Sequence, residues 1–497
     1  MIGKTRFHLL EYLLLFTSVI LLIFGIGFFD LSVPVLDTVS PVLKWLILPL
    51  LVFCIFIPAR FLVAPRCAET LRALLPDRKY EYLVLFVLFW LPRILYKICI
   101  PVAMESDSAL YIGLGAEYAA TGTLSSFNHV VKITPNIAIY VAVLGFFMRI
   151  FGPGAATAQW FCMILNCANI FLFYALARKL TTRGRAFFAA AVFTLIPENV
   201  FYSVIPGIEA ISLFTMLSGL LLIFSITGKK PFVQVLLVLA GSVVLSLSAF
   251  IRPNAWAAIG CAVLWLLCYC GESRARKAIL LTAMIVGLVG SNLWHHAFQR
   301  SFFPGEQPVG GLGWTLYEGL DMNGGAWSEE KAARCREVIE QYNAAESNRV
   351  FTEEAWARFH GYSLTDKIRM FIRKGGNVWY DPGYPVLSIK NPTLFTVGGG
   401  ITALGSFLCV SVWIACMLFR LRRPLQGMGR STCMICLAYI LSTTLWHEFG
   451  TSIGRYRYMM LTFVILMIAV CYPAAAGEAS ASSQNPKSAG RDGGALK

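Results

Sequence analysis

The chain consists largely of uninterrupted apolar blocks, most of them about twenty residues long, and this feature limits its fold more than any other. An α-helix needs roughly 20 apolar residues to cross the ~30 Å hydrocarbon core of a bilayer. Of the 497 residues, 57% are hydrophobic and only 14% are charged, whereas soluble domains carry about 25% charged residues. The sequence therefore predicts an all-α polytopic membrane protein and excludes a soluble, disordered or fibrous one.

About twelve segments are long enough to be predicted as transmembrane helices. They are residues 8–29, 43–63, 82–103, 157–177, 186–205, 209–227, 231–250, 255–270, 278–298, 394–419, 431–447 and 457–474. The block 136–151 is shorter and has Arg149 near its end, so we interpret it as an interfacial segment. With that choice, the positive-inside rule is obeyed by the basic loops 178–185, 229–230, 274–277 and 420–430.

The same rule predicts that both termini lie in the cytoplasm and that the long polar regions lie outside. Because no organelle signal or glycosylation context is obvious, a bacterial plasma membrane is expected. The chain then divides into five predicted regions. They are an added transmembrane helix pair (1–79), a core (80–298) whose first outer loop is 104–156, an extracytoplasmic loop domain (299–393), C-terminal transmembrane helices (394–475) and a disordered cytoplasmic tail (476–497). In the loop domain, helices are predicted over 329–345 and 352–374, with Ser328 and Thr352 as N-caps.

The formal net charge of +15 does not indicate nucleic-acid binding, because the lysines and arginines lie in short loops between apolar blocks, where they set orientation. Most of the fourteen cysteines lie inside apolar blocks, which favours packing over a disulfide framework. No set of His, Cys, Asp and Glu has the spacing of a metal site, so no metal is expected.

Ionisable side chains gather at the span ends that are predicted to face outward. Asp107 follows the third span and precedes a helix predicted over 108–121. Two interpretations are equally good: Asp107 is the N-cap of this helix, or it is a general base for an acceptor hydroxyl at the membrane surface. Arg93 lies deeper, within the third span, and needs a partner there.

Arginines occupy three of these outer positions: Arg252 follows one span, and Arg455 and Arg457 precede the last one. Taken singly, each is more typical of an interfacial anchor than of a ligand. Together they suit a phosphate, because cations at fixed positions stabilise an anionic leaving group.

Several motifs, taken in chain order, resemble the GT-C glycosyltransferases of the protein O-mannosyltransferase and lipid A aminoarabinose transferase type (glycosyltransferase family 39-like). They are Ser106-Asp107-x-x-x-Tyr111, a Pro135-led segment ending in Phe151-Gly152, Arg252-Pro253-Asn254, the outer run 319–330 and Glu448…Arg455-Tyr456-Arg457-Tyr458. The resemblance covers roughly residues 80–475. The sequence departs from the family where Ser106 separates two acidic residues that are often adjacent, and where Thr134-Pro135-Asn136 replaces a Tyr-Pro-Pro-Gly-like run.

The resemblance implies a GT-C-like fold with interfacial helices in the first outer loop. It implies the inverting transfer of a sugar from a polyprenyl-phosphate carrier to a hydroxyl or amine of a glycan, lipid or protein, outside the cytoplasm and without a cofactor. Asp107 would be the general base, with Glu105 as the second choice. Lys132 would join the three arginines in holding the lipid phosphate. Glu209 and Glu448 would orient these cations, contact the sugar, or form structural ion pairs.

Two other functions stay open on the sequence. A polysaccharide polymerase or ligase would use arginine and histidine, which predicts that His295, His296 or His447 matters more than Asp107. A carrier or flippase for lipid-linked glycans would need an aqueous path between related halves. The sequence shows no matching pair of Gly/Pro-broken helices of the kind that such carriers use.

Overall fold

The computed structural model describes residues 10, 12–25, 78–124, 131, 134–303, 312–322, 328–380, 389–422, 425, 427–451 and 454–471. The predicted span 43–63, the predicted tail 476–497 and Lys132 lie outside these residues, as does most of the predicted N-terminal helix pair. Within the described residues, one isolated bridge joins Val102 to Ile389, and all other regular structure is helical. This agrees with the predicted all-α class.

The helices follow the apolar blocks closely. In the core they are α4 (Arg78–Cys99), α5 (Asp107–Thr121), η3 (Pro135–Ile137), α7 (Ala138–Phe151), α8 (Ala155–Leu180), α9 (Arg183–Leu195), α10 (Pro197–Tyr202), α11 (Ile208–Phe224), α12 (Pro231–Ile251), η4 (Pro253–Ala255), α13 (Trp256–Cys268) and α14 (Arg274–Phe302). Beyond it they are α15 (Gly313–Gly319), α16 (Glu329–Gln341), α17 (Ala344–Gly361), α18 (Leu364–Tyr380), α19 (Pro392–Arg422), α20 (Gly427–Phe449), η6 (Gly454–Tyr456) and α21 (Arg457–Cys471).

Four of the described helices, α4, α8, α12 and α14, are long and apolar enough to cross a bilayer. Shorter apolar helices include Tyr12–Gly25, Ile208–Phe224, Pro253–Cys268 and Arg457–Cys471. Each predicted span within the described residues contains helix, but 186–205 is divided into α9 and α10 because Pro197 begins a new helix. The protein is a helical membrane protein, and the count of about twelve crossings stays a prediction.

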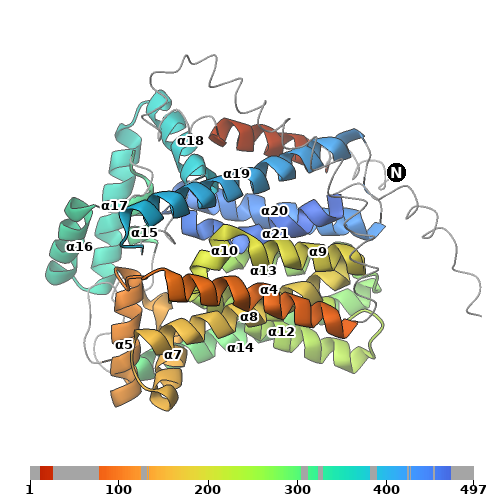
Figure 1. Cartoon of the computed structure of the whole chain (residues 1–497), viewed down its shortest axis with the longest axis horizontal. Helices are drawn as coiled ribbons and strands as arrows, with labels where there is room; N and C mark the ends of the chain where they lie inside the picture. Colours follow the sequence, from red (N-terminus) through yellow and green to blue (C-terminus); the bar gives the residue numbers. More distant parts are fainter. Residues whose placement is uncertain are drawn as a thin grey trace, which may run out of the picture.

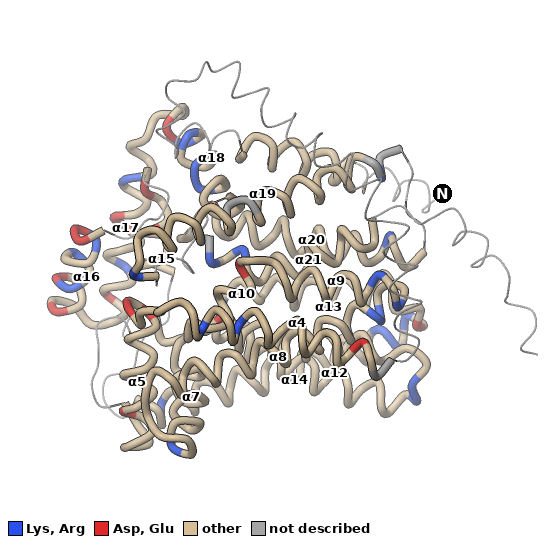
Figure 2. Tube along the Cα trace, in the orientation of Figure 1, with Lys and Arg blue, Asp and Glu red and all other residues tan. Residues whose placement is uncertain are grey.

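The bundle has two chemically different ends. Figure 1 shows the long helices running side by side, with α5 lying across one end and α15, α16 and α17 gathered at that same end. At the opposite end, Figure 2 shows lysine and arginine near the turns that join α8 to α9 and precede α12 and α14. This arrangement matches the shared side predicted for the basic loops, and it leaves α5 and α7 at the other end.

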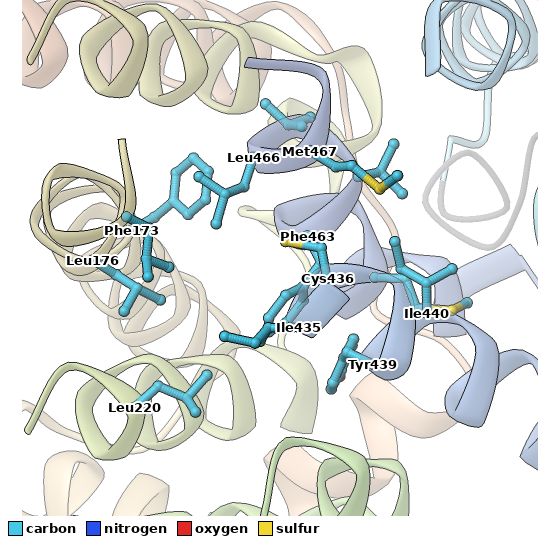
Figure 3. Close-up of a cluster of buried hydrophobic side chains, with 14 of the residues drawn as sticks. Phe173, Leu176, Leu220, Ile435, Cys436, Tyr439, Ile440, Phe463, Leu466 and Met467 are labelled. Carbon is cyan, nitrogen blue, oxygen red and sulfur yellow. The ribbon is translucent and has the colours of Figure 1, made fainter. Parts of the chain in front are cut away.

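The centre of the bundle is apolar and tightly packed. Side chains of α8, α11, α20 and α21 meet there, among them Phe173, Leu220, Ile435 and Phe463 (Figure 3). The helices α11 and α12 cross at close range, because a Cβ on Gly219 would lie 2.8 Å from the carbonyl oxygen of Gly241. Small residues allow such close approach between membrane helices.

Arg93 is fully buried in α4, and its predicted need for a partner is met without a carboxylate. Its guanidinium donates to Ser203 Oγ (2.6 Å), Thr194 O (2.9 Å) and Phe89 O (2.9 Å). These bonds tie α4 to α9 and to the residue after α10. Hydrogen bonding of this kind offsets the cost of placing a cation at depth in the membrane.

The outer helices α15 to α18 share a small hydrophobic core of their own, which includes Tyr317, Val338, Phe351 and Met370. The N-cap predicted at Ser328 is confirmed, since its hydroxyl accepts the Lys331 N–H (3.3 Å).

The bounds predicted for the two outer helices, 329–345 and 352–374, are wrong, because α16 ends at Gln341 and the rest forms two further helices, α17 and α18. Thr352 lies inside α17, and its hydroxyl donates to Asn348 O (2.7 Å). The caps are instead Asn343 for α17 and Ser363 for α18, whose side chains accept backbone N–H groups of the following turn.

Candidate active site

Asp107 is the first residue of α5, at the end of the bundle where α5 lies across the long helices (Figure 1). The predicted N-cap role is wrong, because the cap position belongs to Ser106 and no side chain caps this helix. Ser106 has φ 53°, and no other non-glycine residue in the described part of the chain has a positive φ. Backbone strain of this kind concentrates at functional sites.

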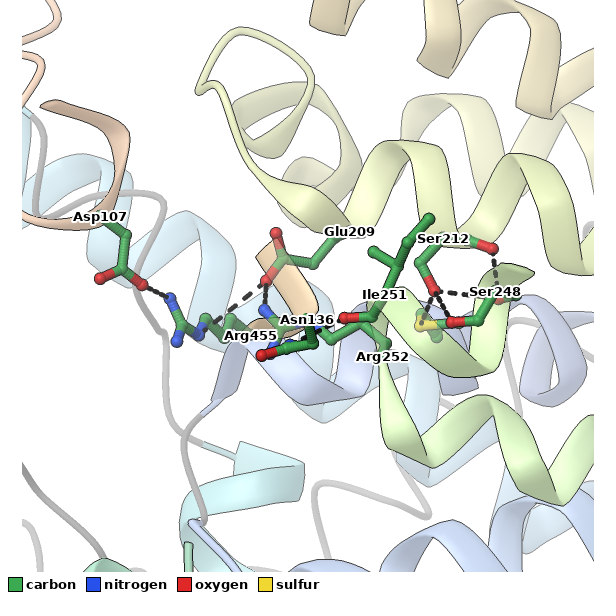
Figure 4. A network of polar contacts seen from close by, with 9 residues as sticks. Asp107, Asn136, Glu209, Ser212, Ser248, Ile251, Arg252 and Arg455 are labelled. Carbon is green, nitrogen blue, oxygen red and sulfur yellow. Dashed lines mark hydrogen bonds and ion pairs between the residues drawn. The ribbon is translucent and has the colours of Figure 1, made fainter. Parts of the chain in front are cut away.

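The Asp107 carboxylate belongs to a network of charged groups that Figure 4 shows as a chain. Arg455, in η6, donates from Nη1 to Asp107. The Arg455 Nε lies 3.9 Å from Glu209 Oε1, and the same oxygen accepts from Arg252. Two carboxylates and two guanidiniums therefore alternate, and they come from four separate segments of the chain.

The backbone around Glu209 and Arg252 holds both side chains in place. Glu209 lies in the first turn of α11, and Gly207 gives it room, since a Cβ there would lie 2.5 Å from Glu209 Oε2. Arg252 follows α12 directly, and Asn136 of η3 donates to the neighbouring carbonyl of Ile251 (2.9 Å). These contacts join η3, α11 and α12 at a single point.

Tyr456 contributes an aromatic ring that both guanidiniums approach. The Arg252 Cζ lies 5.1 Å and the Arg455 Cζ 5.4 Å from the ring centroid, within cation–π range. The ring of His447 stacks on Tyr456 at 4.4 Å, and His447 Nδ1 lies 3.0 Å from Thr451 O. The residues before α21 thus form a compact support for the two cations.

The charges around Asp107 determine its protonation. Burial alone would raise its pKa, but the hydrogen bond and charge of Arg455, with the charge of Arg252, hold the pKa below its ordinary value. Asp107 is therefore ionised at neutral pH and is able to accept a proton.

The outer helices contact this site through α15. Thr451 donates its hydroxyl to Glu318 Oε2 (2.9 Å), and burial raises the pKa of Glu318 to about 7 against the opposing effects of Thr451, Lys331 and Arg455. The buried Lys374 of α18 donates to Gly319 O (2.7 Å) and to Glu448 O. The turn that carries Arg455 is thereby fixed to the outer helices.

Other predicted site residues lie apart from the network. Glu105 is exposed and faces Lys390 at 3.9 Å. Arg457 is fully buried and pairs with Glu198 at 3.0 Å, so its charge is balanced inside the bundle. The Glu448 carboxyl group is buried near Lys374, and neither of its oxygens has a hydrogen-bond partner among the described residues. Lys132 lies outside the described residues.

The histidines of the alternative function are divided between two places. His447 belongs to the support around Tyr456. His295, in α14, stacks on Phe250 with the ring centroids 4.1 Å apart, and His296 lies next to it. In the described part of the chain, no group of three or more His, Cys, Asp or Glu side chains is placed to hold a metal ion.

Sequence reasoning missed Glu318, Thr451 and Lys374. A lysine or glutamate in a polar outer segment normally indicates a solvated surface. Only the packing of α15 and α18 on the end of α20 buries these groups, so no local pattern marks them. Tyr456 lies inside a recognised motif, but the sequence does not show that two distant guanidiniums converge on its ring.

No protein-family model matches this chain, and no curated protein matches it. Among solved structures, it is similar to the oligosaccharyltransferase AglB from Archaeoglobus fulgidus in complex with an inhibitory peptide and a dolichol-phosphate, with a TM-score of 0.47 and 14% identity over 79% of this chain and 50% of that one. The apo form of the Archaeoglobus enzyme gives a TM-score of 0.46 at 14% identity, with the same coverage.

The structure is also similar to ArnT from Cupriavidus metallidurans bound to undecaprenyl phosphate, with a TM-score of 0.33 and 12% identity over 78% of this chain and 77% of that one. The chain spans about half the length of the archaeal oligosaccharyltransferase chains that it matches.

Proposed function

We propose that this protein is a membrane glycosyltransferase that moves a sugar from a polyprenyl-phosphate carrier to an acceptor on the extracytoplasmic side of the plasma membrane, with inversion. The observation that carries the proposal is the meeting of Asp107 with Arg455, Glu209 and Arg252 at one end of the bundle. A carboxylate beside two guanidiniums provides a proton acceptor and a phosphate-binding pair in one place.

The proposed reaction is a single displacement. The acceptor oxygen or nitrogen attacks the anomeric carbon while its proton passes to Asp107. The bond from that carbon to the phosphate oxygen breaks, and its electron pair stays on the phosphate. Arg252 and Arg455 stabilise the phosphate as it leaves. A positioned base contributes about 10²–10⁴-fold to such a step, and no cofactor takes part in the proposal.

The surroundings of the site suit a lipid-linked donor. On α7, Phe146, Ile150 and Phe151 are exposed, and Arg149 is exposed beside them. A short helix with an exposed apolar face and a cation suits the interface between water and the acyl chains. The carrier would then reach the site from the outer leaflet.

Purified protein incubated with a panel of polyprenyl-phosphate sugars tests the proposal. We expect at least one donor to be consumed, with release of polyprenyl phosphate and a product of inverted anomeric configuration. Consumption without inversion would contradict the single displacement.

If no donor is used and His447→Ala abolishes glycan polymerisation, the polymerase or ligase would replace the proposal. Transport across vesicles without sugar transfer would favour the carrier.

A further inference from the structure

The site holds its two arginines in a fully neutralised state. Arg252 is paired with Glu209, and Arg455 is paired with Asp107 and faces Glu209 at 3.9 Å. Two positive and two negative formal charges cancel, so the network offers no net positive charge to an arriving anion. A lipid phosphate must therefore take a guanidinium away from one of the carboxylates before it is bound firmly.

The exposed fractions of the two carboxylate side chains indicate which ion pair an arriving phosphate would break. The Asp107 side chain is 32% exposed, whereas that of Glu209 is only 12% exposed. Asp107 stands at the end of the chain of charges, with Arg455 as its ion-pair partner, while Glu209 lies between two guanidiniums. The bond from Arg455 to Asp107 lies at one end of the network that Figure 4 shows, and a phosphate arriving from solvent would meet the more exposed Asp107 first.

We propose that Arg455 exchanges partners when the donor binds, passing from Asp107 to the lipid phosphate, so that the acceptor base is released only in the presence of donor. The inference rests on the proposed function and adds its order of events. Glu209 and the ring of Tyr456 would keep the Arg455 guanidinium close to the site during the exchange. A freed Asp107 has both oxygens available for the acceptor proton.

The exchange also explains how the enzyme would avoid activating an acceptor without a donor. While Arg455 holds Asp107, one carboxylate oxygen is occupied and the negative charge is compensated, which makes the group a weaker base. The proton of the acceptor then goes to Asp107 only after the guanidinium has moved to the phosphate, where the breaking bond leaves its electron pair.

Binding of undecaprenyl phosphate to the full-length protein in nanodiscs of neutral lipid tests the exchange without requiring catalysis. Asp107→Asn leaves Arg455 without its competing carboxylate, so we expect binding to tighten about fivefold. Arg455→Ala should weaken binding about tenfold. In the Arg455→Ala background, Asp107→Asn should change the affinity less than about twofold, because the competition is lost.

Equal tightening by Asp107→Asn in both backgrounds would overturn the exchange, since it would reflect only general repulsion between Asp107 and the phosphate. Unchanged affinity in Asp107→Asn would also overturn it. Asp107→Ser serves as a second variant if the asparagine protein does not fold. Glu354→Gln removes a carboxylate that pairs with Arg334 on the outer helices, and this matched control should leave the affinity unchanged.

The exchange and the proposed function fail in different ways. Tightening in Asp107→Asn without sugar transfer from any donor would support a phosphate-controlled Arg455 and remove the transferase. Transfer by the wild-type protein with an unchanged affinity in Asp107→Asn would keep the transferase and remove the exchange.

Discussion

At the scale of single residues, Tyr456 is the side chain that both cations of the site approach. Each contact between a guanidinium and the ring is worth about 0.5–1 kcal/mol. Tyr456→Leu is therefore expected to lower kcat/KM for the donor by about tenfold. Tyr456→Phe keeps the ring and should stay within about threefold of wild type. Equal losses in both variants, measured by steady-state sugar transfer, would show that the hydroxyl and not the ring is important.

Asp107 also shows how far local sequence rules reach. The sequence selects it as a candidate, yet capping and catalysis fit the local pattern equally well, because both place an acidic residue before a helix. The structure places Ser106 at the cap position and pairs Asp107 with Arg455, which is 348 residues away along the chain. Asp107, Arg252 and Glu209 could thus be named from the sequence, whereas their connection through Arg455 depends on tertiary packing.

At the scale of elements, the end of α15 is fixed to the end of α20 by the Lys374 ammonium group, which donates to carbonyls of both. Lys374→Met keeps the length of the side chain but leaves these buried carbonyls without this donor. We expect a loss of about 2–4 kcal/mol in stability, because each unsatisfied buried group costs about 1–3 kcal/mol. Thermal unfolding in detergent measures the change.

The matched control for Lys374 is Lys367→Met on the same helix. Lys367 lies over the ring of Phe359 at 4.9 Å and is only half-buried. Its replacement should shift the unfolding temperature little. Equal shifts for the two variants would contradict the view that Lys374 joins α18 to the bundle.

Glu318 of α15 makes the same junction sensitive to pH. Its pKa is raised by burial from 4.5 to about 7 in the folded protein. Between these values the folded chain keeps a proton that the unfolded chain has lost, so stability falls as the pH rises from about 4.5 to about 7. Glu318→Gln should exceed wild type in stability at pH 8 by on the order of 1 kcal/mol, and the advantage should disappear near pH 5.

Unfolding measured at both pH values tests this expectation. Glu337→Gln serves as the control, because Glu337 is exposed beside Arg334 on α16. A stability difference between Glu318→Gln and wild type that does not change with pH would mean that Glu318 titrates normally.

Element boundaries were predictable where a strong apolar block or a helix-ending glycine sets them. The helix predicted over 108–121 begins at Asp107 and ends before Gly122, whose φ of 76° suits glycine at a C-cap. The outer helices were less predictable, because Thr352 resembles an N-cap but lies inside α17. A threonine whose hydroxyl donates to a carbonyl of its own helix cannot be told by local sequence from a threonine that caps a helix.

At the scale of the whole molecule, the separation of charge between the two ends of the bundle sets the expected orientation. Lys229 precedes α12 at the basic end, whereas Glu340 is exposed on α16, which lies at the opposite end of the bundle (Figure 2). In intact cells, a membrane-impermeant maleimide should label Glu340→Cys above the wild-type background but should label Lys229→Cys only after lysis. The opposite pattern would place the site in the cytoplasm.

The apolar blocks predict a helical bundle. The distribution of lysine and arginine predicts that the basic loops share one end of it. Neither predicts which helix ends meet, because neighbours in a bundle are set by packing between distant segments. The close crossing at Gly219 and Gly241 and the bonds of Arg93 to α9 illustrate this. The meeting of Asp107, Glu209 and Arg252 at Arg455 likewise joins segments that are distant in the sequence.

The central claim is that Asp107 accepts the proton of the acceptor during sugar transfer. Transfer from an active polyprenyl-phosphate sugar by the purified protein, compared among wild type, Asp107→Asn and Glu105→Gln, tests this most directly. We expect Asp107→Asn to remain folded, to bind the donor and to lose transfer by about 10²–10⁴-fold. Glu105→Gln should stay close to wild type, because Glu105 faces Lys390 and not the network. Transfer that survives in Asp107→Asn would contradict the account.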